Sequence, residues 1–488
     1  MATISSLGIG ANLDLSGLLE NIKSGEQVPL VALQKQQTAF TAKLSAYGQL
    51  NSALSALQTA AQALGKPETF TGVKATASAT DVLSATASAS ASGGVYSINV
   101  TQLTQAQSLA TAGVASTTAK VGLDVTSTVT IDFGTISGAT ADPVTGKYTG
   151  ATFTPDASRT AATFTLDASN NTLAGIRDAI NGNADLGVTA SIVNDGSASP
   201  NRLVLVSKTS GEASSMRIAV AGDATMAGLL NSDPEGAPAA QLQETVTAQN
   251  TKLTVNGIAI TSASNSVADA VQDVTMTVSK VGTSTLTVSN DTGSVKTAIN
   301  TFVKAYNSLQ SAATKLSSYD ASNDVGGVLL GDSVLRNIQV GIRSALTSAQ
   351  TDDGSGLTML SNIGVSFQKD GTLLADDTKL TAALGSKLSG VANLFSGSAG
   401  VGGYGTQLAA LITTYTETNG TLSSATKGLN SSLDMLSERY DKTQERIDAT
   451  VARYKAQFTQ LDLMISRMNA TSTYLTQQFD ALNNTSKN

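Results

Sequence analysis

The sequence predicts a multidomain α+β protein in which both ends of the chain form an antiparallel helical coiled-coil stalk that carries two inserted β-rich lobes. Two apolar seams, one opening at Pro29 and one at Leu429, advance by alternating steps of three and four residues, the spacing of a helix with one buried face. Between about 70 and 290, short alternating segments replace this spacing, as in β-strands. Because one long helix cannot bury its own seam, we expect the two terminal helices to cover each other.

The two seams define the residues of the expected coiled coil. In the first helix they are Leu30, Leu33, Phe40, Leu44, Tyr47, Leu54 and Leu57. In the second helix they are Leu429, Leu433, Leu436, Tyr440, Ile447, Val451, Tyr454, Phe458, Leu461 and Ile465.

Residues 1–28 precede the first seam and are only weakly patterned. One helical face of two to three turns can be drawn there, which is marginal for an isolated helix. The end of the chain, 469–488, also carries apolar residues with no obvious cover. We therefore expect both segments to be mobile legs that contact a partner. The contact residues are expected to be Leu7, Ile9, Leu13, Leu15, Leu18, Leu19, Ile22, Tyr474, Leu475 and Phe479.

The first stalk helix is expected to begin at Pro29, because proline fits the first helical turn, and to end before Gly65. The second helix runs for about 40 residues, or about 60 Å at the helical rise. Together with the helices that return after Asp291, these segments assign the stalk domain to 29–76 and 291–468.

The middle of the chain reads as two β-rich lobes, with turn residues between strands. An inner lobe is expected from 77–110 and 236–290, and an outer lobe from 111–235. One helix, 173–180, interrupts the strands and ends at Asn181-Gly182. The strands are predicted at 95–100, 128–133, 162–166, 202–206, 252–255, 274–278 and 284–288.

Helical spacing returns after Asp291. One helix is predicted over 295–316. The sequence Gly331-Asp332-Ser333 is expected to cap the next. Asp370-Gly371 predicts a hairpin whose two central residues both take positive φ. Asp376 and Asp377 are expected to cap a helix through Leu388. A glycine-rich loop, 396–405, then precedes a helix over 408–415.

Composition argues against an enzyme. The chain has no Cys and no His, so thiolate nucleophiles, Ser-His-Asp triads and most zinc sites are excluded. We expect no catalytic residue, no cofactor and no metal. The net charge of −7 argues against nucleic-acid binding. No apolar run approaches the length of a membrane span, and the first residues do not resemble a cleavable signal peptide.

One glycine-rich segment is a candidate cofactor site. Residues 400–405 read Gly-Val-Gly-Gly-Tyr-Gly, which matches the dinucleotide fingerprint as letters. That fingerprint requires a strand before it and an acidic residue about 20 positions later. Neither is expected here, so a flexible linker is the better interpretation.

Several separate motifs, in the right order, resemble one family. At the N-terminus these are 7–14 (Leu-Gly-Ile-Gly-Ala-Asn-Leu-Asp), 18–20 (Leu-Leu-Glu) and 26–29 (Glu-Gln-Val-Pro). Further on they are 302–307 (Phe-Val-Lys-Ala-Tyr-Asn), 329–333 (Leu-Leu-Gly-Asp-Ser), 363–373 and 394–395. Together they resemble the family of the flagellar filament-capping protein, hook-associated protein 2. The segments 178–181, 187–190 and 203–205 are similar to a β-rich insertion motif shared among flagellar axial proteins.

The resemblance implies a function and a set of partners. The chain would form a ring with itself, commonly of five subunits, at the distal end of the bacterial flagellum, where it promotes flagellin folding and insertion and prevents loss of unpolymerised flagellin. It would be secreted to the cell exterior through the flagellar type III system. Flagellin, hook-filament junction proteins and an export chaperone that binds the C-terminal region are the implied partners.

Two alternatives stay open. The β-rich middle could be an adhesin or glycan-binding module that contacts host mucin, which some members of the family are reported to do. The chain could also be a flagellin-like filament subunit, which shares the arrangement of helical ends.

Overall fold

The computed structural model describes residues 14–398 and 400–485. It divides into two compact units. A helical unit comprises Met1–Phe70 and Thr292–Asn488, and a β unit comprises Thr71–Asp291. The chain therefore leaves the helical unit once and returns to it once, as the sequence predicted.

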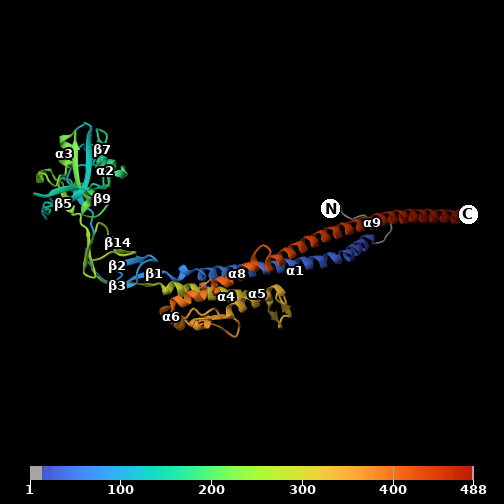
Figure 1. Ribbon diagram of the computed structural model, residues 1–488. Helices are drawn as coiled ribbons and strands as arrows, with labels where there is room; N and C mark the ends of the chain where they lie inside the picture. Colours follow the sequence, from blue (N-terminus) through green and yellow to red (C-terminus); the bar gives the residue numbers. More distant parts are fainter. Residues whose placement is uncertain (1–13, 399, 486–488) are drawn as a thin grey trace. The chain divides into compact units, whose positions relative to one another are not determined.

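The two terminal helices lie side by side. In Figure 1, α1 (Leu15–Leu64) packs along α9 (Thr421–Thr485), and the two run in opposite directions. Between them, the Gln34 side-chain amide donates to the Tyr440 hydroxyl at 3.3 Å. Leu436 and Ile447 of α9 are buried. The predicted antiparallel pairing of both chain ends is confirmed.

The start of α1 differs from the prediction. The helix begins at Leu15, and Pro29 lies inside it. The Asp14 carboxylate caps the first turn by accepting from the Gly17 N–H at 2.8 Å. A proline inside a helix removes the backbone hydrogen bond to the residue four positions earlier, here Gly25, and its ring crowds that carbonyl. The helix α1 nevertheless continues through Pro29 to Leu64. Most of the segment 14–28 is thus part of the stalk helix.

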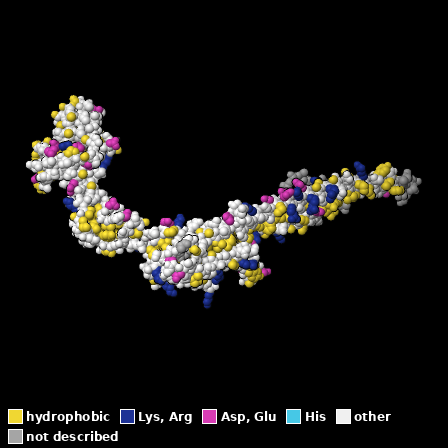
Figure 2. Space-filling model, viewed as in Figure 1, with side chains coloured by type: hydrophobic (Ala, Val, Ile, Leu, Met, Phe, Trp, Pro, Cys, Tyr) yellow, Lys and Arg dark blue, Asp and Glu magenta, His cyan; other side chains and the backbone are white. Residues whose placement is uncertain are grey.

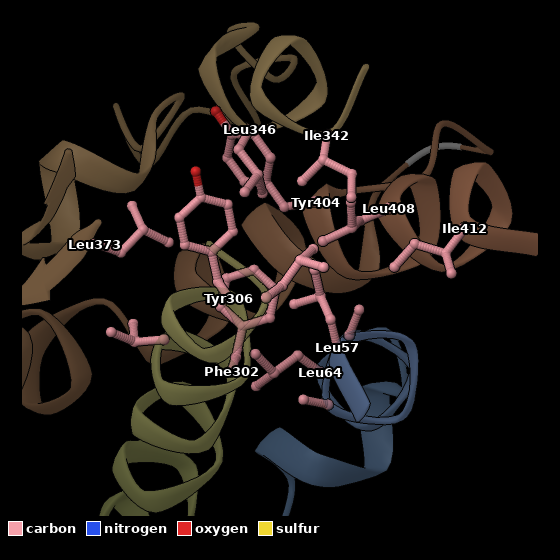
Figure 3. Packing of buried hydrophobic residues seen from close by; sticks show 14 of the residues in the cluster. Leu57, Leu64, Phe302, Tyr306, Ile342, Leu346, Leu373, Tyr404, Leu408 and Ile412 are labelled. Carbon is pink, nitrogen blue, oxygen red and sulfur yellow. The ribbon is translucent and has the colours of Figure 1, made fainter. Parts of the chain in front are cut away.

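The second half of α1 is covered by other helices. Leu50, Leu54, Leu57 and Leu64 belong to a core shared with α4 (Thr292–Ser317), α5 (Ser333–Thr347) and α8 (Tyr404–Thr416). Figure 3 shows residues of all four helices converging there. The Gln58 amide also donates to the Thr413 hydroxyl of α8 at 2.8 Å. The prediction that α9 covers the whole seam of α1 was therefore wrong for Tyr47, Leu54 and Leu57. These three residues lie in this larger core.

Shorter elements complete the helical unit. The hairpin β19 (Val365–Phe367) and β20 (Leu373–Ala375) packs on α4, and α6 (Asp377–Ser386) and α7 (Leu388–Ser396) follow. A small hairpin, β17 (Tyr319–Asp320) and β18 (Val325–Gly326), joins α4 to α5. In the β19–β20 turn, Gly371 has φ +84° and Asp370 is not among the residues of positive φ, because the loop is longer than the two-residue turn that was predicted.

The inner lobe of the β unit holds two antiparallel sheets around one core. The five-stranded sheet has the order β1 (Val73–Ala77), β16 (Gly282–Asn290), β3 (Gly94–Gln102), β12 (Thr251–Val255) and β13 (Ile258–Ser262). The three-stranded sheet has the order β14 (Ser266–Val271), β15 (Val274–Val278) and β2 (Leu83–Ala87). Ile98, Met276 and Leu286 are buried between them. The first and last strands pair, with Val73 opposite Asn290, and the Asp291 N–H donates to the Gly72 carbonyl at 2.7 Å.

The outer lobe also has two sheets. One contains β10 (Ser215–Ala221), β5 (Ser127–Ser137), β6 (Thr152–Pro155) and β7 (Ala162–Leu166). The other has the order β11 (Gln243–Val246), β4 (Ser108–Ala110), β9 (Asn201–Ser207) and β8 (Val188–Asn194). Helices α2 (Leu173–Asn181) and α3 (Ala224–Leu230) share their core.

Short 3-10 helices lie at Pro67–Phe70, Ala184–Leu186, Glu212–Ser214, Pro238–Ala240 and Leu360–Ile363.

The pairings place the lobe boundaries differently from the prediction. Strands β4 and β11 pair with each other inside the outer lobe, although 108–110 and 243–246 were assigned to the inner lobe. Strand β1 lies in the inner lobe, although 73–76 was assigned to the stalk. These strands have three to five residues, and the lobe to which each belongs is set by the strand with which it pairs, which the spacing of apolar residues does not show.

Candidate assembly surface on the terminal helices

The helix α9 extends beyond the start of α1 (Figure 1). Because Gln34 contacts Tyr440 and both helices rise about 1.5 Å per residue, Leu15 lies opposite about residue 459. The rest of α9, to Thr485, is then roughly 40 Å long at that rise. Every side chain over 466–481 is exposed. We call 460–481 the C-terminal overhang.

An apolar stripe continues along the overhang. Leu461, Ile465, Met468, Leu475 and Phe479 follow one another in steps of three, four or seven, which is the seam spacing of the paired part. Their exposure contrasts with that part: Met468 is 61% and Phe479 62% exposed, whereas Ile447 is 0% exposed. Figure 2 shows hydrophobic side chains along this end of the helix. The overhang thus presents a helical binding face that the described chain leaves uncovered.

Charge falls along the same length. The paired part of α9 carries dense charges of both signs, such as Glu438 and Lys442, which pair at (i, i+4). Over 460–481 the charged residues are only Asp462, Arg467 and Asp480. Loss of charge around exposed large apolar side chains is typical of the core of a protein–protein interface.

The structure divides the residues that were predicted to contact a partner. Tyr474, Leu475 and Phe479 are exposed at 59%, 48% and 62%. Leu18 is exposed at 48%, whereas Leu15 and Leu19 are buried at 5% and 2%, so neither is available as it stands. Ile22 is half-buried. Leu7, Ile9 and Leu13 lie outside the described residues.

Sequence reasoning missed two exposed side chains of the overhang, Leu463 and Met464, at 55% and 58%. Met468, which is 61% exposed, continues the seam spacing. Within the seam itself, burial follows the packing. Leu30, Leu33, Tyr47, Leu54, Leu57, Leu436 and Ile447 are buried; Phe40, Leu44, Leu429, Leu433, Tyr440, Val451, Tyr454, Phe458 and Ile465 are half-buried; Leu461 is exposed.

A buried carboxylate ties α1 to the start of α5 at the base of the stalk. Asp332 Oδ1 accepts from the Leu335 N–H at 3.0 Å and so caps α5. Asp332 Oδ2 accepts from the Tyr47 hydroxyl at 2.8 Å and lies 2.7 Å from Lys43 Nζ. Burial alone would raise the pKa of Asp332, but the bonds from Lys43, Leu335 and Tyr47 lower it below the ordinary value. The same burial and the bond to Asp332 raise the pKa of Tyr47.

Two asparagines from the recognised motifs act as backbone clamps. Asn181 Nδ2 donates to the Ala190 carbonyl and Asn181 Oδ1 accepts from the Ala190 N–H, both at 2.8 Å. Asn307 makes the same two bonds with Leu373: its Nδ2 donates to the Leu373 carbonyl at 2.8 Å, and its Oδ1 accepts from the Leu373 N–H at 2.7 Å. Each amide thereby occupies both hydrogen-bonding groups of one strand residue and fixes a helix to a strand edge.

No helix in the described part of the chain is long and apolar enough to span a bilayer. Likewise, within 14–398 and 400–485, no three His, Cys, Asp or Glu side chains gather in a way that could hold a metal ion.

Family models match most of the chain. The model of the flagellar hook-associated protein 2 N-terminus matches residues 11–107. The model of the flagellar hook-associated protein 2 C-terminus matches 248–470. Between them, the flagellin hook IN motif matches 150–209, which includes Asn181 and its partner Ala190.

Relatives and solved structures agree with these matches. The chain is 39% identical to flagellar hook-associated protein 2 of Escherichia coli strain K12, over 98% of this chain and 99% of the relative. It is 40% identical to that of Salmonella typhimurium strain LT2, over 99% of this chain and 100% of the relative. The crystal structure of the D1-D2-D3 domains of the flagellar cap protein FliD from Escherichia coli is similar at 36% identity and a TM-score of 0.60, covering 79% of this chain and 99% of that chain. Matched over nearly its whole length, the chain belongs to the flagellar hook-associated protein 2 family.

Proposed function

We propose that this protein forms an oligomeric ring that caps the distal end of the flagellar filament. There it shelters arriving flagellin while flagellin folds and inserts, and it prevents loss of unpolymerised flagellin. The observation that carries the proposal is the C-terminal overhang, an apolar stripe at the end of a long paired helix that residues 14–398 and 400–485 leave uncovered.

The overhang is suited to reversible contact with helical subunits. A helix with one exposed seam binds by completing a coiled coil or by lying in a groove. Full burial of a side chain such as Leu475 or Phe479 contributes about 1.5–3 kcal/mol. A few such contacts hold a leg in place, and each can be released separately when a new subunit arrives.

The stalk supplies the rigidity that such a leg needs. Its paired helices share buried side chains such as Leu436 and Ile447, and the base is fixed through Asp332. The remaining partners follow from the family: the hook-filament junction proteins, an export chaperone that binds the C-terminal region, and the flagellar type III export system that would carry the chain to the cell exterior.

A matched pair of variants tests the role of the overhang. Phe479→Asp places a charge on the stripe, and Val144→Asp does the same at a residue of the outer lobe that is 82% exposed. In a strain without its own cap gene, Phe479→Asp should shorten filaments and release flagellin into the medium, whereas Val144→Asp should restore normal filaments. Both proteins should keep the wild-type circular dichroism spectrum. Normal filaments with Phe479→Asp, or with a chain truncated before 469, would refute the proposed role.

The outer lobe supports a second candidate, a glycan-binding module. A cavity of about 490 Å³ lies over β5 and β10, and its lining includes Asp132, Arg217, Asn231 and Asp233. Arg217 lies over the Phe153 ring at 4.5 Å and pairs with Asp132 at 2.8 Å. Carboxylates, an amide and a guanidinium could bind sugar hydroxyls. Binding of the full chain to a glycan array, lost in Asn231→Ala, would support this candidate, and a blank array would contradict it.

A further inference from the structure

A small hairpin of the helical unit exposes several large apolar side chains to solvent. Strands β17 and β18 and the residues after them present Tyr319, Val325, Val328 and Leu330, which are 55%, 59%, 49% and 53% exposed. The Leu330 side chain lies against β18, since a Cβ on Gly326 would stand 2.8 Å from Leu330 Cδ2. Four large apolar side chains within twelve residues form a patch of the kind that marks an interaction site.

The hairpin is held in shape by its own polar groups. The Tyr319 hydroxyl donates to the Asp324 carboxylate. Asp320 accepts from the Ser322 N–H at 2.9 Å and from the Asn323 amide at 2.8 Å. The Gly327 N–H donates to the Ser318 carbonyl at 2.7 Å, at the end of α4. A patch that is already ordered loses little conformational entropy on binding.

The exposed face of α5 carries a complementary set of residues. Val340 is 63% exposed, and exposed Arg336 and Arg343 stand one turn before and one turn after it. The α5 sequence, 333–347, contains no acidic residue, and the hairpin segment, 318–328, contains no Lys or Arg. One surface is therefore apolar and acidic, and the other is apolar and basic.

We propose that the hairpin of one copy of this chain docks on the exposed face of α5 of a second copy. Val325 and Tyr319 would lie against Val340, and the Asp320 and Asp324 carboxylates would face Arg336 and Arg343. Because two different surfaces meet, the contact is heterologous and links copies head to tail, which closes into a ring when the rotation between copies allows it. The inference deepens the proposed cap, on whose ring it rests, by naming the surface between neighbours in that ring.

The absence of cysteine from the chain permits a direct test in the full-length protein. Val325→Cys and Val340→Cys are made as separate variants, mixed, and oxidised. The mixture should give a disulfide-linked dimer at about ten times the yield of either variant alone, because docking raises the effective concentration of the two thiols. Val144→Cys, mixed with Val325→Cys, is the control for random collision at an exposed position. A charge reversal at the basic face, Arg336→Glu, should lower the yield of the first mixture to that of the control.

Three results would overturn the proposal. The mixture could give no more dimer than the Val144→Cys control. Each single variant could crosslink to itself as well as the mixture does, which would show a contact between like surfaces. Added flagellin could abolish the dimer, which would assign the hairpin to flagellin instead. Failure of this contact is separable from failure of the proposed cap. If the disulfide does not form but the protein still supports wild-type filament growth, only the contact is refuted. If the disulfide forms in a protein that cannot cap filaments, only the cap is refuted.

Discussion

Removing the Asp332 carboxylate should loosen the base of the stalk by a calculable amount. Asp332→Ala deletes the cap of α5, which is worth about 1 kcal/mol. It also leaves the hydroxyl of Tyr47, a residue only 3% exposed, without its acceptor, at a cost of about 1–2 kcal/mol. Lys43 adds little, because its side chain is 35% exposed and such pairs contribute about 0–1 kcal/mol. The expected loss in the free energy of unfolding is about 3 kcal/mol.

Thermal unfolding followed by circular dichroism at the helical band measures this loss in the full chain. Helices dominate the helical unit, so the signal reports mainly on that unit. At about 2–4 °C per kcal/mol for a large domain, the midpoint should fall by about 6–12 °C.

The matched control is Asp376→Ala, which removes the cap of α6. Asp376 accepts from the N–H groups of Thr378 and Lys379 at 3.0 and 3.1 Å at an exposed site, so about 1 kcal/mol should be lost. Equal shifts for the two variants would show that Asp332 acts only as a cap and that its bonds to α1 contribute nothing.

Three further predictions follow from named contacts. The pKa of Asp332 is lowered in the folded protein. The stability advantage of wild type over Asp332→Ala should therefore be constant above about pH 4, the ordinary pKa of an aspartate in the unfolded chain. This advantage should shrink as the pH falls through the lower pKa of folded Asp332, as urea titrations at several pH values would show. Asn181→Ala leaves both backbone groups of Ala190 without the amide and should destabilise the outer lobe by about 1–3 kcal/mol, seen as faster amide exchange in β8; unchanged exchange would contradict the clamp. Ile447→Ala should cost about 2–5 kcal/mol of stability, because the side chain is 0% exposed, whereas Met468→Ala should leave the melting midpoint unchanged and weaken only filament capping.

Long periodic elements could be predicted from sequence alone. The seam spacing gave α9, and the Asp332 cap gave the start of α5, because each signal repeats or has one physical cause. Pro29 misled the prediction for the opposite reason. A single local signal favoured a helix start there, and the burial of Leu15 and Leu19 before Pro29 and of Leu30 and Leu33 after it outweighed the cost of a proline inside the helix.

Contacts between segments that are far apart in the chain could not be predicted from the sequence. Nothing in the spacing of α1 distinguishes Leu54, buried in the core with α4, α5 and α8, from Leu30 nearer the other end of the same helix. Strand β4 is three residues long and becomes recognisable only beside β9 and β11. The clamp roles of Asn181 and Asn307 likewise depend on backbone groups 9 and 66 positions away.

The pairing of β1 with β16, closed by the bond from Asp291 to Gly72, has a consequence for changes in the length of the β unit. The chain enters the β unit through β1 and leaves it through β16, and these two strands are paired. Residues added to or removed from the β unit between these two strands would therefore leave the chain path of the helical unit unchanged.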